Sequence, residues 1–157
     1  MKKVAILMGS EKDMPVMSKA VETLERFGVP HDVLVVSAHK TLDRALAYAD
    51  QAPADGVGII IAGAGKAAHL AGVMAGRTTL PVIGVPLSAS LDGLDALLAT
   101  VQMPTGVPVA TVAVDGSTNA ALLAVAILAV TDESLAKQLS AYREQLAEDT
   151  FREVHRG

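Results

Sequence analysis

Five short runs of apolar, mostly β-branched residues alternate with helical patterns along this chain, and the alternation predicts an α/β fold. The runs are continuously apolar, which is typical of parallel strands that helices cover on both faces. Of the residues, 51% are hydrophobic but only 3% are aromatic, so we expect an aliphatic core. The predicted architecture is flavodoxin-like: three α/β/α layers with a central parallel five-stranded sheet and a C-terminal helix extension.

The chain has 157 residues and is expected to form a single domain, which would bury roughly 70% of the surface that the unfolded chain exposes. Within residues 1–157 we expect an α/β core over 1–130 and a C-terminal helix over 131–157.

The strands are predicted at 4–8, 33–36, 57–61, 82–85 and 109–114. The first helix is expected to open at Pro15, a residue type that suits a first helical turn, and to end at Gly28. Thr41 is a candidate cap for a helix that runs to about Gln51. Further helices are predicted at 67–75, 91–100, 119–130 and 132–155.

The last predicted helix is rich in charge and follows the final strand. Leu135, Leu139, Tyr142 and Leu146 recur along it at helical spacing. This stripe could cover the chain's own core or a neighbouring subunit, and the sequence favours neither interpretation.

Composition excludes several classes of function. The net charge of −4 and the absence of a basic run interleaved with aromatic residues argue against a nucleic-acid partner. The chain has no cysteine, so it has neither disulfides nor a thiolate nucleophile. No secretory signal is visible, and the apolar stretch 120–130 is far shorter than the ~20 residues that span a bilayer. We therefore expect a cytoplasmic protein with no membrane partner.

The first three predicted strands lead into loops of small residues at 9–13, 37–40 and 62–69. Because the carboxyl ends of parallel strands meet at one edge of a sheet, these loops should line one crevice. Glycines let the backbone approach a ligand, and the helix N-termini that follow attract anions. A phosphate-ester pocket is predicted, although the run 63–65 could equally have a steric role. Neither a dinucleotide fingerprint nor a Walker pattern occurs.

His39 is the first candidate for chemistry, because it lies just beyond a predicted buried strand and beside hydroxyl-bearing residues. A histidine titrating near neutrality can take and give a proton, as general acid/base catalysis requires. His69 lies on another crevice loop, where it could contact a ligand or cap its own helix. His31 and His155 are expected to be solvated. No metal site is expected, since no carboxylate or second histidine stands at ligand spacing from His39 or His69.

Charged residues around the crevice point to the kind of substrate. Lys12, Lys40 and Lys66 are expected to surround it, and this positive charge favours an anionic substrate. Asp13 could cap the helix that begins at 14–15, accept hydrogen bonds from sugar hydroxyls, or do both.

Blocks of sequence spread over most of the chain match one known family. They are 8–13 (MGSEKD), 36–41 (VSAHKT), 60–70 (IIAGAGKAAHL), 81–86 (PVIGVP), 91–97 (LDGLDAL), 101–111 (VQMPTGVPVAT) and 119–124 (NAALLA). From residue 4 to about residue 130, the chain resembles the N5-carboxyaminoimidazole ribonucleotide mutases of purine biosynthesis, class I (PurE) of the AIR carboxylase family.

The resemblance implies a homo-octamer of flavodoxin-like subunits that uses neither a metal nor an organic cofactor. It implies conversion of N5-carboxyaminoimidazole ribonucleotide to 4-carboxy-5-aminoimidazole ribonucleotide on the route to IMP, through decarboxylation and recapture of carbon dioxide. The residue matching His39 is implied to act as the general acid/base. The residues implied to contact or line the substrate are Ser10, Asp13, Ser37, Lys40, Gly63, Ala64, Gly65 and His69.

The chain departs from this family pattern at residues 12, 40, 42 and 66. Most members have serine at Lys12, arginine at Lys40, proline at Leu42 and glycine at Lys66. Lysine after the histidine also occurs in the second branch of the family, the aminoimidazole ribonucleotide carboxylases that use free carbon dioxide. That branch lacks the block 63–69, so the mutase is favoured. The carboxylase and a non-catalytic ribotide-binding paralogue are the alternatives.

Overall fold

A parallel sheet forms the centre of the computed structural model, which describes residues 1–155. Within that range five strands lie in the order β2-β1-β3-β4-β5. This is the flavodoxin-like order, so the predicted fold is confirmed. The strand bounds are β1 Lys3–Met8, β2 His31–Val35, β3 Val57–Gly65, β4 Val82–Leu87 and β5 Ala110–Thr111.

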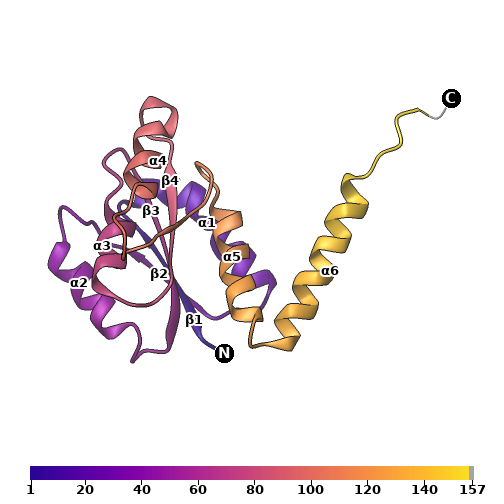
Figure 1. Cartoon of the computed structure of the whole chain (residues 1–157), viewed down its shortest axis with the longest axis horizontal. Coiled ribbons are helices and arrows are strands. Elements are labelled where there is room, and N and C mark those ends of the chain that lie inside the picture. The colour runs from indigo at the N-terminus through magenta and orange to yellow at the C-terminus, as the bar shows by residue number, and fades with distance from the viewer. Residues whose placement is uncertain (156–157) are drawn as a thin grey trace.

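Helices cover both faces of this sheet, as Figure 1 shows. Ile6 and Ile61 pack toward helices α1 and α5, whereas Leu7 and Ile60 pack toward α2 and α3. Successive strand residues therefore enter opposite apolar layers, which explains the continuously apolar runs. The helix bounds are α1 Met14–Arg26, α2 Leu42–Gln51, α3 Leu70–Arg77, α4 Leu94–Val101, α5 Ser117–Ala129 and α6 Glu133–Thr150, with short 3-10 turns η1 Glu11–Asp13 and η2 Leu91–Gly93.

The edge strand β2 is less covered than its sequence predicted. Val33 is 38% exposed and Val35 is 52% exposed. The prediction that helices cover both faces is wrong for this strand, because β2 lies at the edge of the sheet and one row of its side chains stays partly open. Together with the exposed Met14, these valines line a shallow apolar hollow on the outside of the molecule.

Helix α3 begins at Leu70, later than the predicted start at residue 67. Strand β3 continues as far as Gly65, and Lys66 then adopts a left-handed conformation with φ of 55°. The amides of Ala68 and His69 donate to the carbonyl groups two residues earlier, so this segment is a tight turn. The turn occupies the residues that the helical pattern had included.

Strand β5 is shorter than the predicted 109–114, because only Ala110 and Thr111 pair regularly with β4. The chain stays near β4 beyond them, since the amides of Val112 and Asp115 donate to Gly84 and Pro86. Asp115 then takes a positive φ of 58°, and its carboxylate accepts a hydrogen bond from the Ser88 amide. This local turn ends the strand early.

The C-terminal helix α6 packs against the core only over its first half. The Asp132 side chain caps it by accepting from the Leu135 amide at 3.1 Å. Leu135 is fully buried and Tyr142 meets the Phe27 ring edge-on, whereas Leu146 is 52% exposed. The predicted stripe therefore covers its own core near the helix start, and the rest of α6 projects away (Figure 1).

The prediction that this last helix continues to about residue 155 is wrong, because α6 ends at Thr150. Phe151 leaves the helix with an extended backbone, ψ of 127°. Residues 156–157, which the predicted C-terminal helix included, lie outside the described residues. Among residues 1–155, no helix is both long enough and apolar enough to cross a bilayer.

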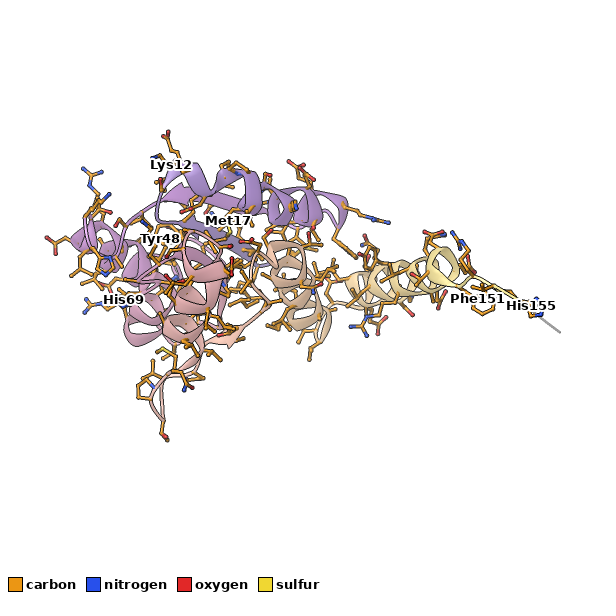
Figure 2. All side chains as sticks on the ribbon, turned by 90° about the horizontal axis from the view of Figure 1, so that it is seen from above. Lys12, Met17, Tyr48, His69, Phe151 and His155 are labelled. Carbon is orange, nitrogen blue, oxygen red and sulfur yellow. The ribbon has the colours of Figure 1, made fainter. Side chains whose placement is uncertain are left out.

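The two histidines expected to be solvated differ in their surroundings. His31 begins β2, but it is partly buried and its Nδ1 lies 3.0 Å from the carbonyl oxygen of Val29, so the expectation that it is solvated is wrong. His155 is exposed and lies beyond α6, at the opposite end of the molecule from His69 (Figure 2).

Candidate functional site

A cavity of about 350 Å³ opens at the carboxyl edge of the sheet. The loops after β1, β2, β3 and β4 all contribute to it, as expected where the chain order reverses between β1 and β3. It is lined by Gly9, Ser10, Asp13, Ser37, Ala38, His39, Lys40, Ala64, Gly65, Lys66, Ala67, His69, Leu70 and Ala89.

The loop after β1 is held by a reciprocal pair of hydrogen bonds. Ser10 Oγ accepts from the Lys12 amide at 3.2 Å, and Asp13 Oδ2 accepts from the Ser10 amide at 3.1 Å. Asp13 precedes α1, but its side chain makes no capping hydrogen bond to that helix, so this predicted cap is wrong. Its carboxylate instead closes η1 and lines the cavity.

The loop after β2 closes on itself around Ser37. Ser37 Oγ accepts from the amides of His39 at 3.3 Å and Lys40 at 3.1 Å. Thr41 Oγ1 accepts from the Ser37 amide at 2.8 Å and donates to its carbonyl oxygen at 3.2 Å. Thr41 therefore does not cap α2 through its side chain, as had been predicted, because its hydroxyl is engaged inside the loop. The backbone that carries His39 is fixed by these bonds.

The His39 and His69 rings meet across the cavity. His39 Nε2 lies 2.7 Å from His69 Nδ1, and the ring planes are inclined at 75°. At this distance one nitrogen donates a proton and the other accepts it. His69 makes no side-chain capping bond to α3, so the capping interpretation for His69 is wrong. The structure brings together two rings that are thirty residues apart in sequence, a pairing that no local motif predicts.

The three small residues of the β3 loop have different surroundings. Ala64 and Gly65 line the cavity, but Gly63 does not. A Cβ added at Gly63 would lie 2.5 Å from Sδ of Met17 in α1, so this glycine permits close packing of the sheet against that helix. A Cβ at Gly65 would lie 2.8 Å from the Ala89 Cβ, so Gly65 lets the β3 and β4 loops approach each other. The predicted substrate contact of Gly63 is therefore not supported by its position.

Two of the three lysines predicted around the crevice line the cavity. They are Lys40 and Lys66, whereas Lys12 is exposed on η1 and is absent from the lining (Figure 2). Ala89, from the loop after β4, is a lining residue that the sequence analysis missed. Its position just beyond a predicted strand was the available signal.

Asp95, at the start of α4, is the anion near Lys66. Its Oδ2 accepts a hydrogen bond from the Ser90 hydroxyl at 2.5 Å. This bond holds the pKa of Asp95 below its usual value, and the Ala96 amide and the positive charge of Lys66 act in the same direction. The positive charge of Lys66 therefore acts on a carboxylate that is not itself part of the cavity lining.

The described residues offer no obvious cation site. Within residues 1–155, no group of three or more histidine, aspartate or glutamate side chains converges in a way that could hold a metal ion.

Comparison with known proteins places this chain in a family. The family model described as AIR carboxylase matches residues 3–149. The chain belongs to the AIR carboxylase family. This confirms the resemblance recognised in the sequence blocks.

Named relatives agree with this placement. The chain is 52% identical to the N5-carboxyaminoimidazole ribonucleotide mutase of Pyrococcus horikoshii over 91% of this chain and 81% of that protein. It is 48% identical to the mutase of Thermotoga maritima over 99% of this chain and 92% of that protein. It is also 54% identical to the chloroplastic phosphoribosylaminoimidazole carboxylase of Vigna aconitifolia over 96% of this chain, but it spans only 27% of that longer protein.

A solved structure has the same architecture. The crystal structure of Treponema denticola PurE superimposes with a TM-score of 0.87 over 95% of this chain and 94% of that chain, at 32% identity. The chain therefore shares the overall fold of that PurE protein.

Asp13 gives a prediction that links the cavity to stability. Burial raises the pKa of Asp13 above its usual value, against a smaller lowering by the hydrogen bond from the Ser10 amide. Since the pKa is higher in the folded state than in the unfolded state, protonation favours folding and the ionised form at neutral pH costs stability. Asp13→Asn is expected to raise the melting temperature by about 1–2 °C at pH 7. The difference from the parent protein should shrink as the pH falls through the raised pKa.

Thermal denaturation of both proteins from neutral to acidic pH measures this effect. Glu22→Gln, at an exposed site on α1, is the matched control and should leave the melting temperature unchanged. A lower melting temperature for Asp13→Asn at pH 7, or an offset independent of pH, would contradict the prediction.

Proposed function

We propose that this protein is an N5-carboxyaminoimidazole ribonucleotide mutase of purine biosynthesis, with His39 as the general acid/base. The observation that supports this most is the His39–His69 ring pair at the wall of a cavity that also holds Ser10, Asp13 and Lys40. The names of the relatives support the same activity, since proteins covered over most of their length by this chain are called mutases. A mutase is an isomerase, so these names agree with the isomerase that the resemblance to the mutases implies.

The proposed reaction moves a carboxyl group without a net change in protons. The bond between the exocyclic nitrogen and the carboxyl carbon breaks, carbon dioxide leaves, and His39 supplies the proton that the nitrogen gains. The nucleophilic ring carbon next to the amine then forms a bond to the carbon dioxide. His39 takes the proton that this ring carbon loses, and the cycle closes. One imidazole serves as acid and then as base because histidine exchanges protons near neutrality.

His69 is proposed to position His39. The two nitrogens at 2.7 Å share one proton in the hydrogen bond, so the His69 ring controls which nitrogen of His39 carries its proton and where that ring points. The remaining lining groups hold the ribotide: the Asp13 carboxylate accepts hydrogen bonds from the ribose hydroxyls, the Ser10 hydroxyl accepts from them or donates to them, and Lys40 attracts the phosphate as a point charge. Ser37, Ala64 and Gly65 shape the cavity around the imidazole ring.

Retention of carbon dioxide requires a cavity that excludes water, and neighbouring copies of the chain are proposed to supply the missing wall. His39 and Lys40 are exposed in the single chain. Apolar side chains are also exposed on α4 and near it, where Leu91 is 75%, Leu94 56% and Leu98 49% exposed. Exposed apolar area of this kind supports self-association, and the homo-octamer implied by the family is the proposed assembly. A cytoplasmic enzyme that needs no organic cofactor or metal is part of the same proposal.

A carboxylase that uses free carbon dioxide is the second candidate. Lys40 directly after His39 favours it, and a phosphoribosylaminoimidazole carboxylase is among the relatives. His69 and its contact with His39 favour the mutase, because the block 63–69 that carries this histidine matches the mutase branch. A non-catalytic ribotide-binding protein is the third candidate. It is considered because Lys40 and Lys66 differ from the residues that most family members have at these positions.

Turnover assays separate these candidates. Purified protein is mixed with N5-carboxyaminoimidazole ribonucleotide, and formation of the 4-carboxy isomer is followed with and without added bicarbonate. The mutase is expected to convert this substrate at the same rate in both conditions. Conversion of only the uncarboxylated ribotide, with a requirement for bicarbonate, would establish the carboxylase, and ribotide binding without turnover would establish the third candidate.

His39→Asn tests the role of the imidazole. The variant should bind product ribotide within about tenfold of the parent affinity, equal to ~1.4 kcal/mol, because asparagine keeps polarity and similar size. Its turnover should fall by roughly 10² or more, since asparagine cannot exchange a proton. Calorimetric binding and steady-state kinetics provide the two readouts.

The control is His31→Asn, a substitution at the start of β2 and away from the cavity lining, for which turnover of the folded protein should stay close to the parent value. Equal losses of binding and turnover in His39→Asn would show that His39 holds the ribotide and does not transfer its proton.

A further inference from the structure

Lys66 lines the cavity, but its positive charge has no role in the reaction proposed above. It follows β3 and lies on the side of the cavity next to the loop after β4, whereas Lys40 follows the edge strand β2 on the other side. The strand order β2-β1-β3-β4 therefore separates the two lysines across the cavity. The His39–His69 pair contributes to the wall of the same cavity.

The backbone conformation at residue 66 does not favour a lysine. Its φ of 55° is in the left-handed region, which glycine adopts freely and a residue with a side chain adopts only with strain. The side chain is exposed and forms no part of either apolar layer. A glycine would adopt this backbone conformation with less strain. The group that lysine adds at this position is its ammonium group, so we look for a role there.

The surroundings of Lys66 show what that group can bind. Asp95 is hydrogen-bonded to the Ser90 hydroxyl and the Ala96 amide, and the positive charge of Lys66 also lowers the pKa of Asp95. The positive charge of Lys66 therefore already acts on one carboxylate. Lys66 lines the cavity and Asp95 does not, so an anionic ligand in the cavity would compete with Asp95 for the Lys66 ammonium group.

The substrate of the proposed function carries an anion at each end, a phosphate on the ribose and a carboxyl group on the imidazole. With the phosphate at Lys40, the carboxyl end extends toward the β3 and β4 loops. We propose that Lys66 binds the carboxyl group of the carboxylated ribotide and thereby distinguishes it from the uncarboxylated ribotide. This inference rests on the proposed function, because it assigns a task to Lys66 within that same cavity.

Paired binding measurements test the assignment. Calorimetry gives the dissociation constants of 4-carboxy-5-aminoimidazole ribonucleotide and of 5-aminoimidazole ribonucleotide for the parent, Lys66→Gly, Lys66→Gln and Lys66→Arg. Loss of the ammonium group in the glycine and glutamine variants should weaken binding of the carboxylated ribotide about tenfold. Binding of the uncarboxylated ribotide should weaken less than about twofold. The arginine variant should keep most of the discrimination. Glycine suits the positive φ, so Lys66→Gly should fold at least as well as the parent.

Two further variants make the test specific. Lys19→Gln removes the same charge from an exposed site on α1 and should change neither constant. Asp95→Asn removes the carboxylate that competes for Lys66, and it should strengthen binding of the carboxylated ribotide by about twofold. A fall in that affinity would contradict the competition that the proposal requires.

The possible outcomes distinguish the role of Lys66 from the proposed mutase function on which it rests. Equal weakening of both ribotides in the Lys66 variants, or no weakening of either, would overturn the role of Lys66 while the parent's ribotide binding still supports the proposed function. A parent protein that binds neither ribotide would overturn both.

Discussion

The site depends on one constraint of topology: β2 and β3 both pair in parallel with β1, so the loops that follow all three strands reach the same edge of the sheet. His39 lies in the loop after β2, and His69 lies in the turn after β3. This order brings their nitrogens to 2.7 Å across thirty residues of sequence. The sheet below and the hydrogen-bonded loops above hold the two rings in place.

Close packing around that edge is possible because of glycine. Gly63 lets β3 pack against Met17 of α1, and Gly65 lets the next residues pass Ala89. A side chain at Gly63 would force Met17 to move, and a side chain at Gly65 would push the β3 loop away from Ala89 and the Leu87 carbonyl, and with it the turn that leads to His69. Small residues thus determine the shape of the cavity, whereas charge at its two sides, Lys40 and Lys66, determines which ligands it attracts.

Much of this arrangement could be predicted from sequence, because it follows from strand patterns and from where each strand ends. The crevice, His39 and the sheet architecture are of this kind. The caps expected from Asp13 and Thr41 were wrong because both side chains have competing partners within their own loops, and residue type alone cannot rank such partners. The exposure of Val35 was missed because a continuous apolar run looks the same in an edge strand and a central one. The His39–His69 contact depends on the spatial position of two loops, which no spacing along the chain encodes.

The central claim is that the carboxyl group moves within one cavity, from nitrogen to carbon, while His39 handles the proton. The most direct measurement uses N5-carboxyaminoimidazole ribonucleotide labelled with ¹³C in its carboxyl group, mixed with the protein and an excess of unlabelled bicarbonate and quenched early. Mass spectrometry of the product then reports the origin of its carboxyl carbon. Retention of the label is the predicted result, because recapture outruns escape from the cavity. Replacement of the label by carbon from bicarbonate would contradict the account.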